Sequence, residues 1–357
     1  MTGSSKWSPS TDPGVGSRRI AGEVLVRVDV DGAYSNLALR HALDSAGLET
    51  ADAKLVTDLV YGTLRMRRSV DYLIGRFLVT DPPPTARAFL RLGAYQLVFR
   101  PDIPAYAAVS ATVSAAPKRF RPLCNAVLRK ITKAPVKYPS IGDELSYPDW
   151  IIEVLVDDLG RERGLEALRE MNSPAAQIRR EDGYTQDKAS QLVAEAIGAQ
   201  PGDVVADLCA APGGKSTGIA ASGAFVVASD SSPTRTGLLA KNAARYGNER
   251  VGVYCADALK PALKPGSADK VLLDAPCSGL GVLRRRPDAR WRLEPEAPAR
   301  LAEIQKEMIS AAVGLLKPDG ELIYSVCTLT AVETIGVDEF VQRELPQLEP
   351  IEAPGGP

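Results

Sequence analysis

Two cysteines stand where a thiol could do chemistry. Cys277 follows closely after Asp274, the end of one apolar run, and Cys327 ends a second apolar run. If both runs are parallel strands of one sheet, their carboxyl ends open into the same crevice, where such folds bind ligands. Turn residues and a carboxylate accompany these thiols, whereas a cysteine inside an apolar strand is usually inert core. Cys277 and Cys327 are therefore the cysteines predicted to carry chemistry.

The other three of the five cysteines are predicted to be structural. Cys124 and Cys255 are interpreted as inert core, and Cys209 as the wall of a glycine-rich loop. No C-x-x-C pair occurs, and an odd count argues against a disulfide framework in a cytosolic chain. His41 is the only histidine. It is interpreted as a helix-face surface residue, and no metal site is predicted.

A glycine-rich loop predicts a cofactor site. Residues 204–217 read VVADLCAAPGGKST, an apolar run followed by a turn and a helix-compatible stretch. Gly213 or Gly214 can take positive φ and lets the backbone approach a ligand. A Walker A loop would need glycine at Cys209, and the dinucleotide pattern G-x-G-x-x-G is missing. The loop favours a cofactor without a pyrophosphate; an ordinary strand-to-helix turn is the alternative.

Carboxylates follow the first four predicted strands of this region. Because parallel strands end at one edge of a sheet, these acids are expected to converge on the ligand crevice. Asp230 lies about 20 residues beyond the loop, where an acid binds ribose hydroxyls in nucleotide-binding folds. Asp257 is placed to accept a hydrogen bond from an adenine amine. The four acids are Asp207, Asp230, Asp257 and Asp274.

The pattern changes at Gly202 from helical spacing to alternating strand and helix signals. Strands are predicted at 203–209, 223–229, 251–256, 270–274 and 321–326, with helices at 215–221, 233–246, 298–316 and 331–343. This alternation predicts an α/β domain with a doubly wound, mostly parallel, Rossmann-like sheet.

The N-terminal part shows only helical spacing. Helices are predicted at 52–66, 69–78, 84–98, 105–117 and 121–132, with Ser35 as the N-cap of an earlier one. We therefore expect a disordered leader over 1–16, an all-α domain over 17–135, a linker and helix over 136–172, and the α/β domain over 173–357. A single amphipathic helix is expected from Asp149 to about Met171.

Charge divides unevenly along the chain. Residues 1–140 hold 20 Lys and Arg against 11 Asp and Glu, whereas the remainder holds 23 against 33. A basic domain attached to an acidic cofactor-binding domain suggests a polyanionic partner. No apolar run is long enough to span a bilayer, and no signal peptide is recognised, so a cytoplasmic protein without membrane contact is expected.

Two basic segments are candidates for nucleic-acid contact. On a helix end, Lys118, Arg119 and Arg121 are placed to meet a phosphate backbone. The second segment follows Cys277 and suits a phosphate backbone with an unstacked base. For both segments, a solvated surface is the alternative. The second segment contributes Arg284, Arg285, Arg286, Arg290, Trp291 and Arg292.

Three motifs together carry a family resemblance. DLCAAPGGKST, LLDAPCSGLGVLRRRPDARW and LIYSVCTLT resemble the RsmB-like (Nop/Sun) group of RNA cytosine-5 methyltransferases. The helical residues 18–135 resemble the NusB-like RNA-binding domain that RsmB carries at its N-terminus. The resemblance covers nearly the whole chain.

The resemblance implies a cofactor, S-adenosylmethionine, and roles for the two cysteines. Cys327 would be the nucleophile, and Cys277 would assist product release. The cofactor would be held by Cys209, Ala210, Ala211, Pro212, Gly213, Gly214, Lys215, Asp230, Asp257 and Asp274.

This chemistry explains the need for thiols and an acid. C5 of cytosine is a poor nucleophile until a thiolate adds to C6. Sulfur suits the step because a thiolate attacks readily and can leave again. Asp274 is placed to hydrogen-bond the N3/N4 edge of the base as charge develops. With no histidine nearby, Cys277, a carboxylate or water remains for the proton transfers.

The expected substrate is 16S rRNA, with tRNA as an alternative, and a monomer is expected. A non-catalytic RNA-binding protein that retains the cofactor fold, and a small-molecule methyltransferase, are the other classes considered; the basic N-terminal domain argues against the latter. The sequence departs from the family at Val326, where threonine is usual. Residues 172–202 are short for the family's RNA-binding insert, and a final strand pair is expected to be missing.

Overall fold

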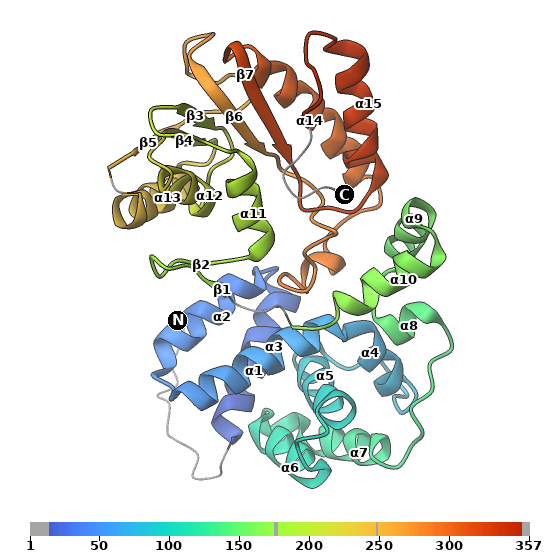
Figure 1. Cartoon of the computed structure of the whole chain (residues 1–357). Coiled ribbons are helices and arrows are strands. Elements are labelled where there is room, and N and C mark those ends of the chain that lie inside the picture. Colours follow the sequence, from blue (N-terminus) through green and yellow to red (C-terminus); the bar gives the residue numbers. More distant parts are fainter. Residues whose placement is uncertain (1–13, 175–177, 248, 352–357) are drawn as a thin grey trace. The chain divides into compact units, whose positions relative to one another are not determined.

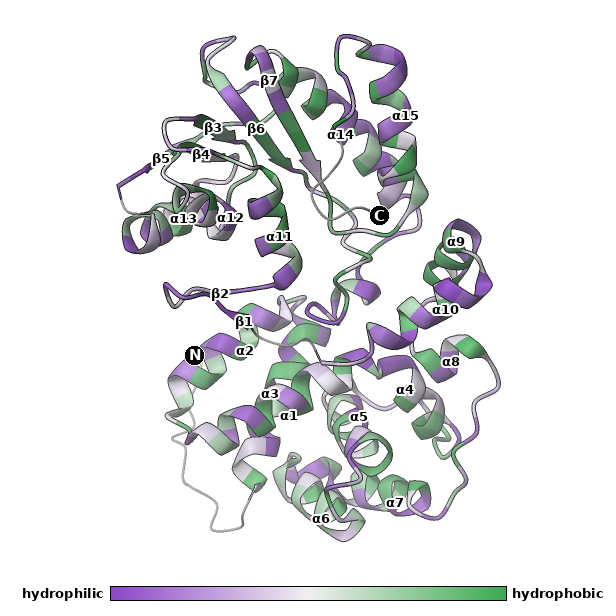
Figure 2. Cartoon of the chain, viewed as in Figure 1, coloured by the Kyte–Doolittle hydropathy of each residue, from purple (hydrophilic) through white to green (hydrophobic). Residues whose placement is uncertain are grey.

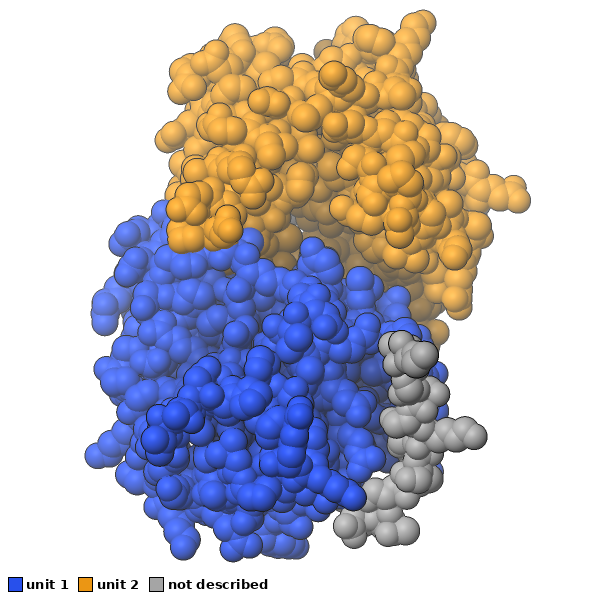
Figure 3. Space-filling model, turned by 180° about the vertical axis from the view of Figure 1, so that it is seen from behind, with its two compact units in different colours: residues 1–174, 283–293 blue, residues 175–282, 294–357 orange. Residues whose placement is uncertain are grey.

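The computed structural model describes residues 14–174, 178–247 and 249–351. The chain forms two compact units: residues 1–174 with 283–293, and residues 175–282 with 294–357 (Figure 3). The chain leaves the second unit after Val282 and returns to it at Glu294. Each unit has its own core and is described separately.

Unit 1 is helical, as predicted (Figure 1). Helix α5 is buried nearly all round, and it packs against five other helices, which is typical of a central core helix. Gly22 and Gly62 allow this packing, because a Cβ on either would collide with an aromatic ring of α5. The first eight elements are α1 (Val15–Val30), α2 (Ser35–Ala46), α3 (Thr50–Arg65), α4 (Arg67–Gly75), α5 (Pro84–Phe99), α6 (Ala105–Ala115), η1 (Lys118–Phe120) and α7 (Arg121–Ile131).

Three further α-helices of unit 1 follow. They are α8 (Ile141–Leu145), α9 (Asp149–Leu159) and α10 (Arg161–Glu170). The expected single helix from Asp149 is therefore wrong, because Gly160 takes a positive φ of 80° and separates two helices. Figure 2 shows hydrophilic and hydrophobic segments alternating along the helices of this unit, as amphipathic packing requires.

The start of unit 1 also differs from expectation. Helix α1 begins at Val15, inside the predicted leader; the rest of that leader, residues 1–13, lies outside the described residues. Ser35 is the first residue of α2 rather than its cap. Its N–H and hydroxyl donate to the Asp288 carboxylate at 3.2 and 2.6 Å, so a distant acid caps this helix.

Unit 2 is the predicted α/β fold, a parallel five-stranded sheet of order β5-β4-β3-β6-β7 (Figure 1). A short hairpin, β1 (Ile178–Arg179) with β2 (Thr185–Gln186), and α11 (Lys188–Ala196) precede it. The strands are β3 (Val204–Asp207), β4 (Phe225–Asp230), β5 (Val251–Cys255), β6 (Ala268–Asp274) and β7 (Leu316–Ser325). The other elements are α12 (Gly214–Ala220), α13 (Pro233–Tyr246), η2 (Ala289–Trp291, in unit 1), α14 (Ala297–Val313), η3 (Ala331–Glu333) and α15 (Ile335–Glu344).

Both faces of the sheet are covered. On one face, Val205 and Leu272 pack with residues of α11, α12 and α13. On the other, Ala206 and Val271 pack with α14 and α15. Strand order reverses between β3 and β6, and this switch point is where open α/β sheets bind ligands. Within the described ranges, no helix is long and apolar enough to cross a membrane.

Candidate functional site

The loop after β3 is a close-fitting turn. Its Ala210 N–H donates to the Ser229 carbonyl at 2.8 Å, and the Gly213 N–H donates to the Ala210 carbonyl at 2.7 Å. Gly213 has φ of 103°, and a Cβ there would lie 2.8 Å from a Leu239 methyl. A Cβ on Gly214 would lie 2.8 Å from the ring of Tyr184. Both glycines are therefore required by backbone conformation or by space.

The β1–β2 hairpin supports this loop from outside. The Arg180 guanidinium donates to the Gly214 carbonyl at 2.6 Å and to the Thr217 hydroxyl at 3.0 Å. It also lies 4.9 Å from the ring centre of Tyr184. Arg180 could not be recognised from the sequence, because its only local signal is one charge in a polar turn.

Asp207, the first of the four acids, lies beneath the loop. Its side chain is fully buried, and its Oδ2 accepts a 2.6 Å hydrogen bond from the Ser216 hydroxyl. Burial, the largest cause, raises the pKa of Asp207 to about 7. Among the described residues, Oδ1 has no hydrogen-bond partner, which leaves one buried acceptor for a ligand or water.

The raised pKa of Asp207 predicts a pH dependence of stability. Between the ordinary value of 3.8 and about 7, the folded chain holds a proton that the unfolded chain has lost. The free energy of unfolding therefore falls as pH rises through this window, and the loss is complete above about pH 7. Asp207→Asn should remove this dependence; thermal unfolding at acid and neutral pH tests it. The exposed Asp338→Asn is the control, and identical pH profiles for Asp207→Asn and wild type would contradict the assignment.

The other acids differ in accessibility. Asp230 is buried, with Oδ1 accepting the Ser232 N–H at 3.0 Å and Oδ2 paired with Arg235 at 3.0 Å. Asp257 is exposed, and its Oδ1 accepts the Leu259 N–H at 3.0 Å. Asp230 is therefore held rigidly, whereas Asp257 faces solvent.

Asp274 joins the cofactor loop to the strand that precedes Cys277. Its Oδ2 accepts a hydrogen bond from Lys215 Nζ at 2.6 Å, and the pair is largely shielded from solvent. Two predicted site residues from α12 and β6 are thus in direct contact. A lysine paired in this way neutralises the carboxylate and orients it.

The structure brings the two cysteines together. Their Sγ atoms lie 3.3 Å apart, and the Cys327 N–H points at Cys277 Sγ, also at 3.3 Å. Cys327 is exposed, whereas Cys277 is half-buried. The hydrogen bond with the Cys327 thiol, and then burial, hold the pKa of Cys277 far above its usual range. Cys277 therefore stays a thiol at neutral pH, and Cys327 is the accessible sulfur.

Of the remaining three cysteines, two agree with their interpretation and one does not. Cys124 is fully buried, in agreement with the interpretation as core. Burial and three neighbouring carboxylates raise the pKa of Cys209 to about 12, so it is unreactive as a wall residue. The interpretation of Cys255 as core is wrong: it is exposed, because it ends β5, the edge strand of the sheet.

The arginine-rich segment is part of unit 1, and Arg290 is fully buried there. Its Nη1 donates to the Ser146 carbonyl at 3.1 Å and to Asn172 Oδ1 at 3.0 Å. Its guanidinium lies 3.9 Å from the ring centre of Tyr147. Burial lowers the pKa of Arg290 to about 10. This arginine is structural, so RNA contact is not proposed for it.

Two neighbours of Arg290 also bind unit 1. Trp291 Nε1 donates to the Leu64 carbonyl at 2.7 Å, which anchors the indole. Arg292 donates to the Gly32 carbonyl at 2.9 Å and to the carbonyl of Ala33. Of the three arginines that precede them, Arg284 and Arg285 are half-buried and Arg286 is exposed.

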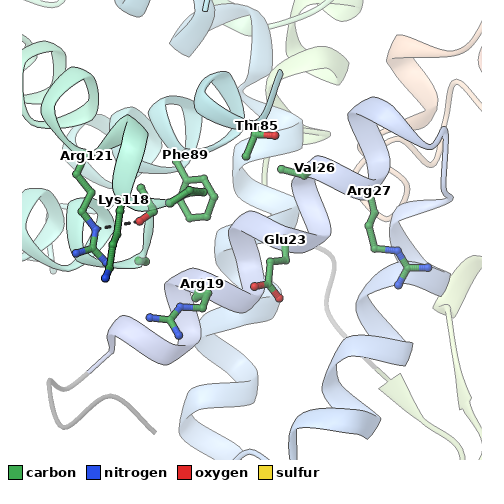
Figure 4. A pocket seen from close by; sticks show the side chains of 11 residues that line it. Arg19, Glu23, Val26, Arg27, Thr85, Phe89, Lys118 and Arg121 are labelled. Carbon is green, nitrogen blue, oxygen red and sulfur yellow. Dashed lines mark hydrogen bonds between the residues drawn. The ribbon is translucent and has the colours of Figure 1, made fainter. Parts of the chain in front are cut away.

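The other basic segment borders a cavity of about 500 Å³ in unit 1 (Figure 4). Lys118 and Arg119 are exposed, but Arg121 donates to two carbonyls that end α6 and is partly committed to that role. The cavity wall is mainly apolar with a cationic rim. It is lined by Arg19, Glu23, Val26, Arg27, Thr85, Phe89, Ala115, Ala116, Pro117, Lys118 and Arg121.

A second missed group lies behind the cysteines. Glu333 is fully buried and accepts hydrogen bonds from Ser278, Gln305 and Thr330. Its sequence signal, Thr330-x-x-Glu333, matches a capping box and would indicate only the start of a helix.

Fold and site together define a Rossmann-like methyltransferase domain joined to a NusB-like helical domain. The family description "16S rRNA methyltransferase RsmB/F" matches residues 194–355, and the NusB family matches residues 16–133. Ribosomal RNA small subunit methyltransferase B of Thermus thermophilus is 35% identical over 94% of this chain and 90% of its own length. The chain belongs to the RsmB/F methyltransferase family.

Two further comparisons agree. Ribosomal RNA small subunit methyltransferase B of Erwinia tasmaniensis is 29% identical over 91% of this chain and 90% of its own. The crystal structure of PH0851 has the same fold, with a TM-score of 0.78 at 22% identity, and covers 98% of this chain and 94% of that one.

The methyl donor is S-adenosylmethionine. The loop fits it: two glycines leave no room for side chains, and the buried Asp207 has an acceptor to spare. We propose that loop residues 209–215 with Asp230, Asp257 and Asp274 hold it.

Arg180 should be required for tight binding of this donor. Arg180→Ala removes two hydrogen bonds that fix α12 and the loop. We expect the Kd for S-adenosylmethionine, measured by calorimetry, to rise about tenfold, the loss of one to two hydrogen bonds. Arg179→Ala, at an exposed neighbouring position, should bind normally. Unchanged affinity in Arg180→Ala would show that the hairpin does not support the loop.

Proposed function

We propose that this protein methylates C5 of a cytosine in RNA, with 16S rRNA as the substrate, through a covalent adduct between Cys327 and C6. The observation that carries the proposal is the pair of sulfurs 3.3 Å apart at the ends of β6 and β7. One cysteine of the pair is accessible and the other is held as a thiol. Asp274, fixed by Lys215, precedes Cys277 on the same strand end.

The proposed attack begins with Cys327 as thiolate, which accepts a hydrogen bond from the Cys277 thiol. The sulfur forms a bond to C6, and Asp274 hydrogen-bonds the N3/N4 edge of the ring as charge develops there. The donor, when bound, supplies the methyl group that C5 receives. The target base must leave its stack to enter the crevice.

Release returns the enzyme to its starting state. The C5 proton passes to water or a carboxylate, the C6–S bond breaks, and its electron pair returns to Cys327 as thiolate. The Cys277 S–H stabilises that thiolate by hydrogen bonding and keeps its own proton. A donor with a strongly raised pKa suits this role, because it does not ionise between turnovers.

The choice of substrate rests on the relatives and on unit 1. The similar proteins named above are called small subunit ribosomal RNA methyltransferases, and the NusB match covers the basic helical unit. Lys118, which lines the cavity of Figure 4, is exposed, and so are Arg119 and Arg286. We propose that these three contact the RNA backbone in the cytoplasm, with the protein acting as a monomer.

The test is methyl transfer to defined nucleic acids. Full-length protein and methyl-labelled S-adenosylmethionine are incubated with unmodified 16S rRNA, tRNA or cytidine, and the digests are analysed by mass spectrometry. The proposal expects 5-methylcytidine from 16S rRNA only. Product from tRNA would reassign the substrate, and product from cytidine would favour a small-molecule enzyme. Binding of the donor with no product would favour a non-catalytic RNA-binding protein.

A further inference from the structure

We propose that Glu333 is a positioning residue that holds the two site cysteines at their working distance. The proposal concerns the loop after β6, residues 275–282 (the Cys277 loop), and the segment after β7, residues 326–330 (the Cys327 loop). It rests on the proposed function, since it assigns a role within that site. Glu333 acts on the cysteines through these two loops, because its carboxyl group accepts hydrogen bonds from Ser278 and Thr330.

One carboxyl group gathers donors from three segments. Oε1 accepts the Ser278 N–H at 2.8 Å and the Gln305 side-chain amide at 3.1 Å. Oε2 accepts the Ser278 hydroxyl at 2.5 Å and the Thr330 hydroxyl at 2.9 Å. Ser278 belongs to the Cys277 loop and Thr330 to the Cys327 loop, so the carboxyl group ties one loop to the other.

Three further contacts restrict the movement of the two loops. The Gln305 amide also donates to the Pro276 carbonyl at 2.9 Å, so it fixes the peptide just before Cys277. The Tyr324 hydroxyl, on the strand that leads to Cys327, lies 2.9 Å from Gln305 Oε1 and 2.8 Å from the Glu333 carbonyl. The Cys277 loop is thereby held on both sides of its cysteine.

The hydroxyls are arranged as a directed chain. The Ser278 hydroxyl donates its single hydrogen to Glu333, so the Thr328 hydroxyl, 2.8 Å away, must be the donor to Ser278. Ser278, Thr328, Thr330 and Glu333 are all buried. In a buried network every member must be satisfied, so the carboxyl group and the two loops have one good arrangement.

Helix capping does not account for this glutamate. In a capping box the side chain at this spacing returns to the N-cap backbone. Here it accepts from Ser278 across the site, and α15 begins later, at Ile335. The turn η3 therefore presents the Glu333 carboxyl group to the Cys277 loop.

The distance between the two sulfurs matters for catalysis, because the Cys277 thiol must donate a hydrogen bond to the Cys327 sulfur. A sulfur displaced by about 1 Å can cost about 10²-fold in rate when reacting groups are prealigned. Replacing Glu333 with glutamine puts an amide donor among four donors, so at least one must turn away. We expect the Cys277 and Cys327 loops to separate in this variant.

A trivalent arsenical tests, in the absence of substrate, whether the sulfurs of Cys277 and Cys327 lie close together. Phenylarsine oxide condenses with two nearby thiols, forming two As–S bonds and releasing one water. Intact-protein mass spectrometry follows capture by full-length wild type and Glu333→Gln, with peptide mapping to Cys277 and Cys327. We expect capture by this pair to slow at least about tenfold in the variant, in line with lost prealignment. Cys327→Ala gives the background from other thiols.

Kinetics supply the second readout. In Glu333→Gln, kcat for RNA methylation should fall about 10²-fold while KM for S-adenosylmethionine changes less than about twofold, as expected for lost alignment without lost binding. Glu333→Asp, which keeps the carboxylate, should recover part of both readouts. Glu303→Gln, an exposed glutamate on α14, is the matched control and should behave as wild type.

The outcomes separate this proposal from the function it rests on. If wild type transfers no methyl group but captures the arsenical through both cysteines, and Glu333→Gln captures it more slowly, the proposed function fails and the positioning role stands. Normal capture and normal kcat in a folded Glu333→Gln protein would overturn the positioning role. If that variant does not fold, Ser278→Ala, which removes one donor and keeps the Ser278 N–H, carries the same test; wild-type readouts there would overturn the proposal.

Discussion

Cys327→Ala is expected to abolish methyl transfer, whereas Cys277→Ala should form the RNA adduct and fail to release it. Without the Cys327 thiolate, C5 is not activated, and a loss of at least about 10³-fold is typical of a missing nucleophile. Without the Cys277 thiol, the departing thiolate loses its hydrogen-bond donor at 3.3 Å. Release should slow about 10- to 10²-fold, because a hydrogen bond to a charged group contributes about 1.5–3 kcal/mol. Gel electrophoresis under denaturing conditions measures the adduct.

Cys255→Ala is the control for this pair. It removes an exposed thiol at the end of another strand of the same sheet and should leave turnover near wild type. The division of roles is contradicted if the adduct accumulates in Cys327→Ala and not in Cys277→Ala. That result would exchange the two assignments.

Arg290→Ala should be the most destabilising single change in unit 1. The variant loses a fully buried side chain and leaves a cavity against Tyr147. It also deprives the buried Ser146 carbonyl and the half-buried Asn172 side chain of their donor. Large-to-small changes of this kind with unsatisfied acceptors cost about 3–5 kcal/mol. Urea denaturation with hydrogen exchange of residues 61–66 and 141–147 would measure the loss.

Two matched variants make the Arg290 result specific. Arg286→Ala removes an exposed arginine of the same segment and should change stability by less than about 0.5 kcal/mol. Arg290→Lys keeps a cation but not the planar fork, so an intermediate loss is expected. Equal protection of unit 1 in Arg290→Ala and wild type would show that the segment does not support the helical unit.

The carboxyl edge of the sheet could be predicted because its signals are local. Apolar runs and the turns that follow them predict the carboxyl ends of β6 and β7 to within one residue. The start of β7 at Leu316 lies five residues before the predicted start. Parallel topology then requires their loops to share an edge. This reasoning predicted that Cys277 and Cys327 would be neighbours, and the 3.3 Å separation of their sulfurs agrees.

The burial of some residues of the arginine-rich segment could not be predicted in the same way. Nothing local distinguishes the buried Arg290 from the exposed Arg286; the difference arises from carbonyls at Ser146 and Arg65, far away in sequence. Composition suggests a phosphate-binding loop for both. Tertiary packing decides that one of them binds protein instead.

The exposure of Cys255 and the hydrogen bonds of Glu333 could not be predicted from the sequence for related reasons. Cys255 lies in an apolar strand, but it is exposed because β5 is an edge strand. The order of strands in a sheet cannot be predicted from the residues of one strand. Glu333 has a spacing that suits a helix cap, whereas its partners come from β6's loop and α14. A residue whose role depends on three separate segments leaves no periodic signal in its own.

The most direct measurement uses RNA in which the target cytidine carries fluorine at C5. The fluorine cannot leave as a proton does, so methyl transfer stops with the enzyme still attached to the base. Wild-type protein is incubated with this RNA and S-adenosylmethionine, digested, and the RNA-linked peptide is identified by mass spectrometry. The account predicts one methylated adduct on Cys327. An adduct on Cys277, or methylation of unsubstituted RNA with no adduct in the fluorinated one, would contradict it.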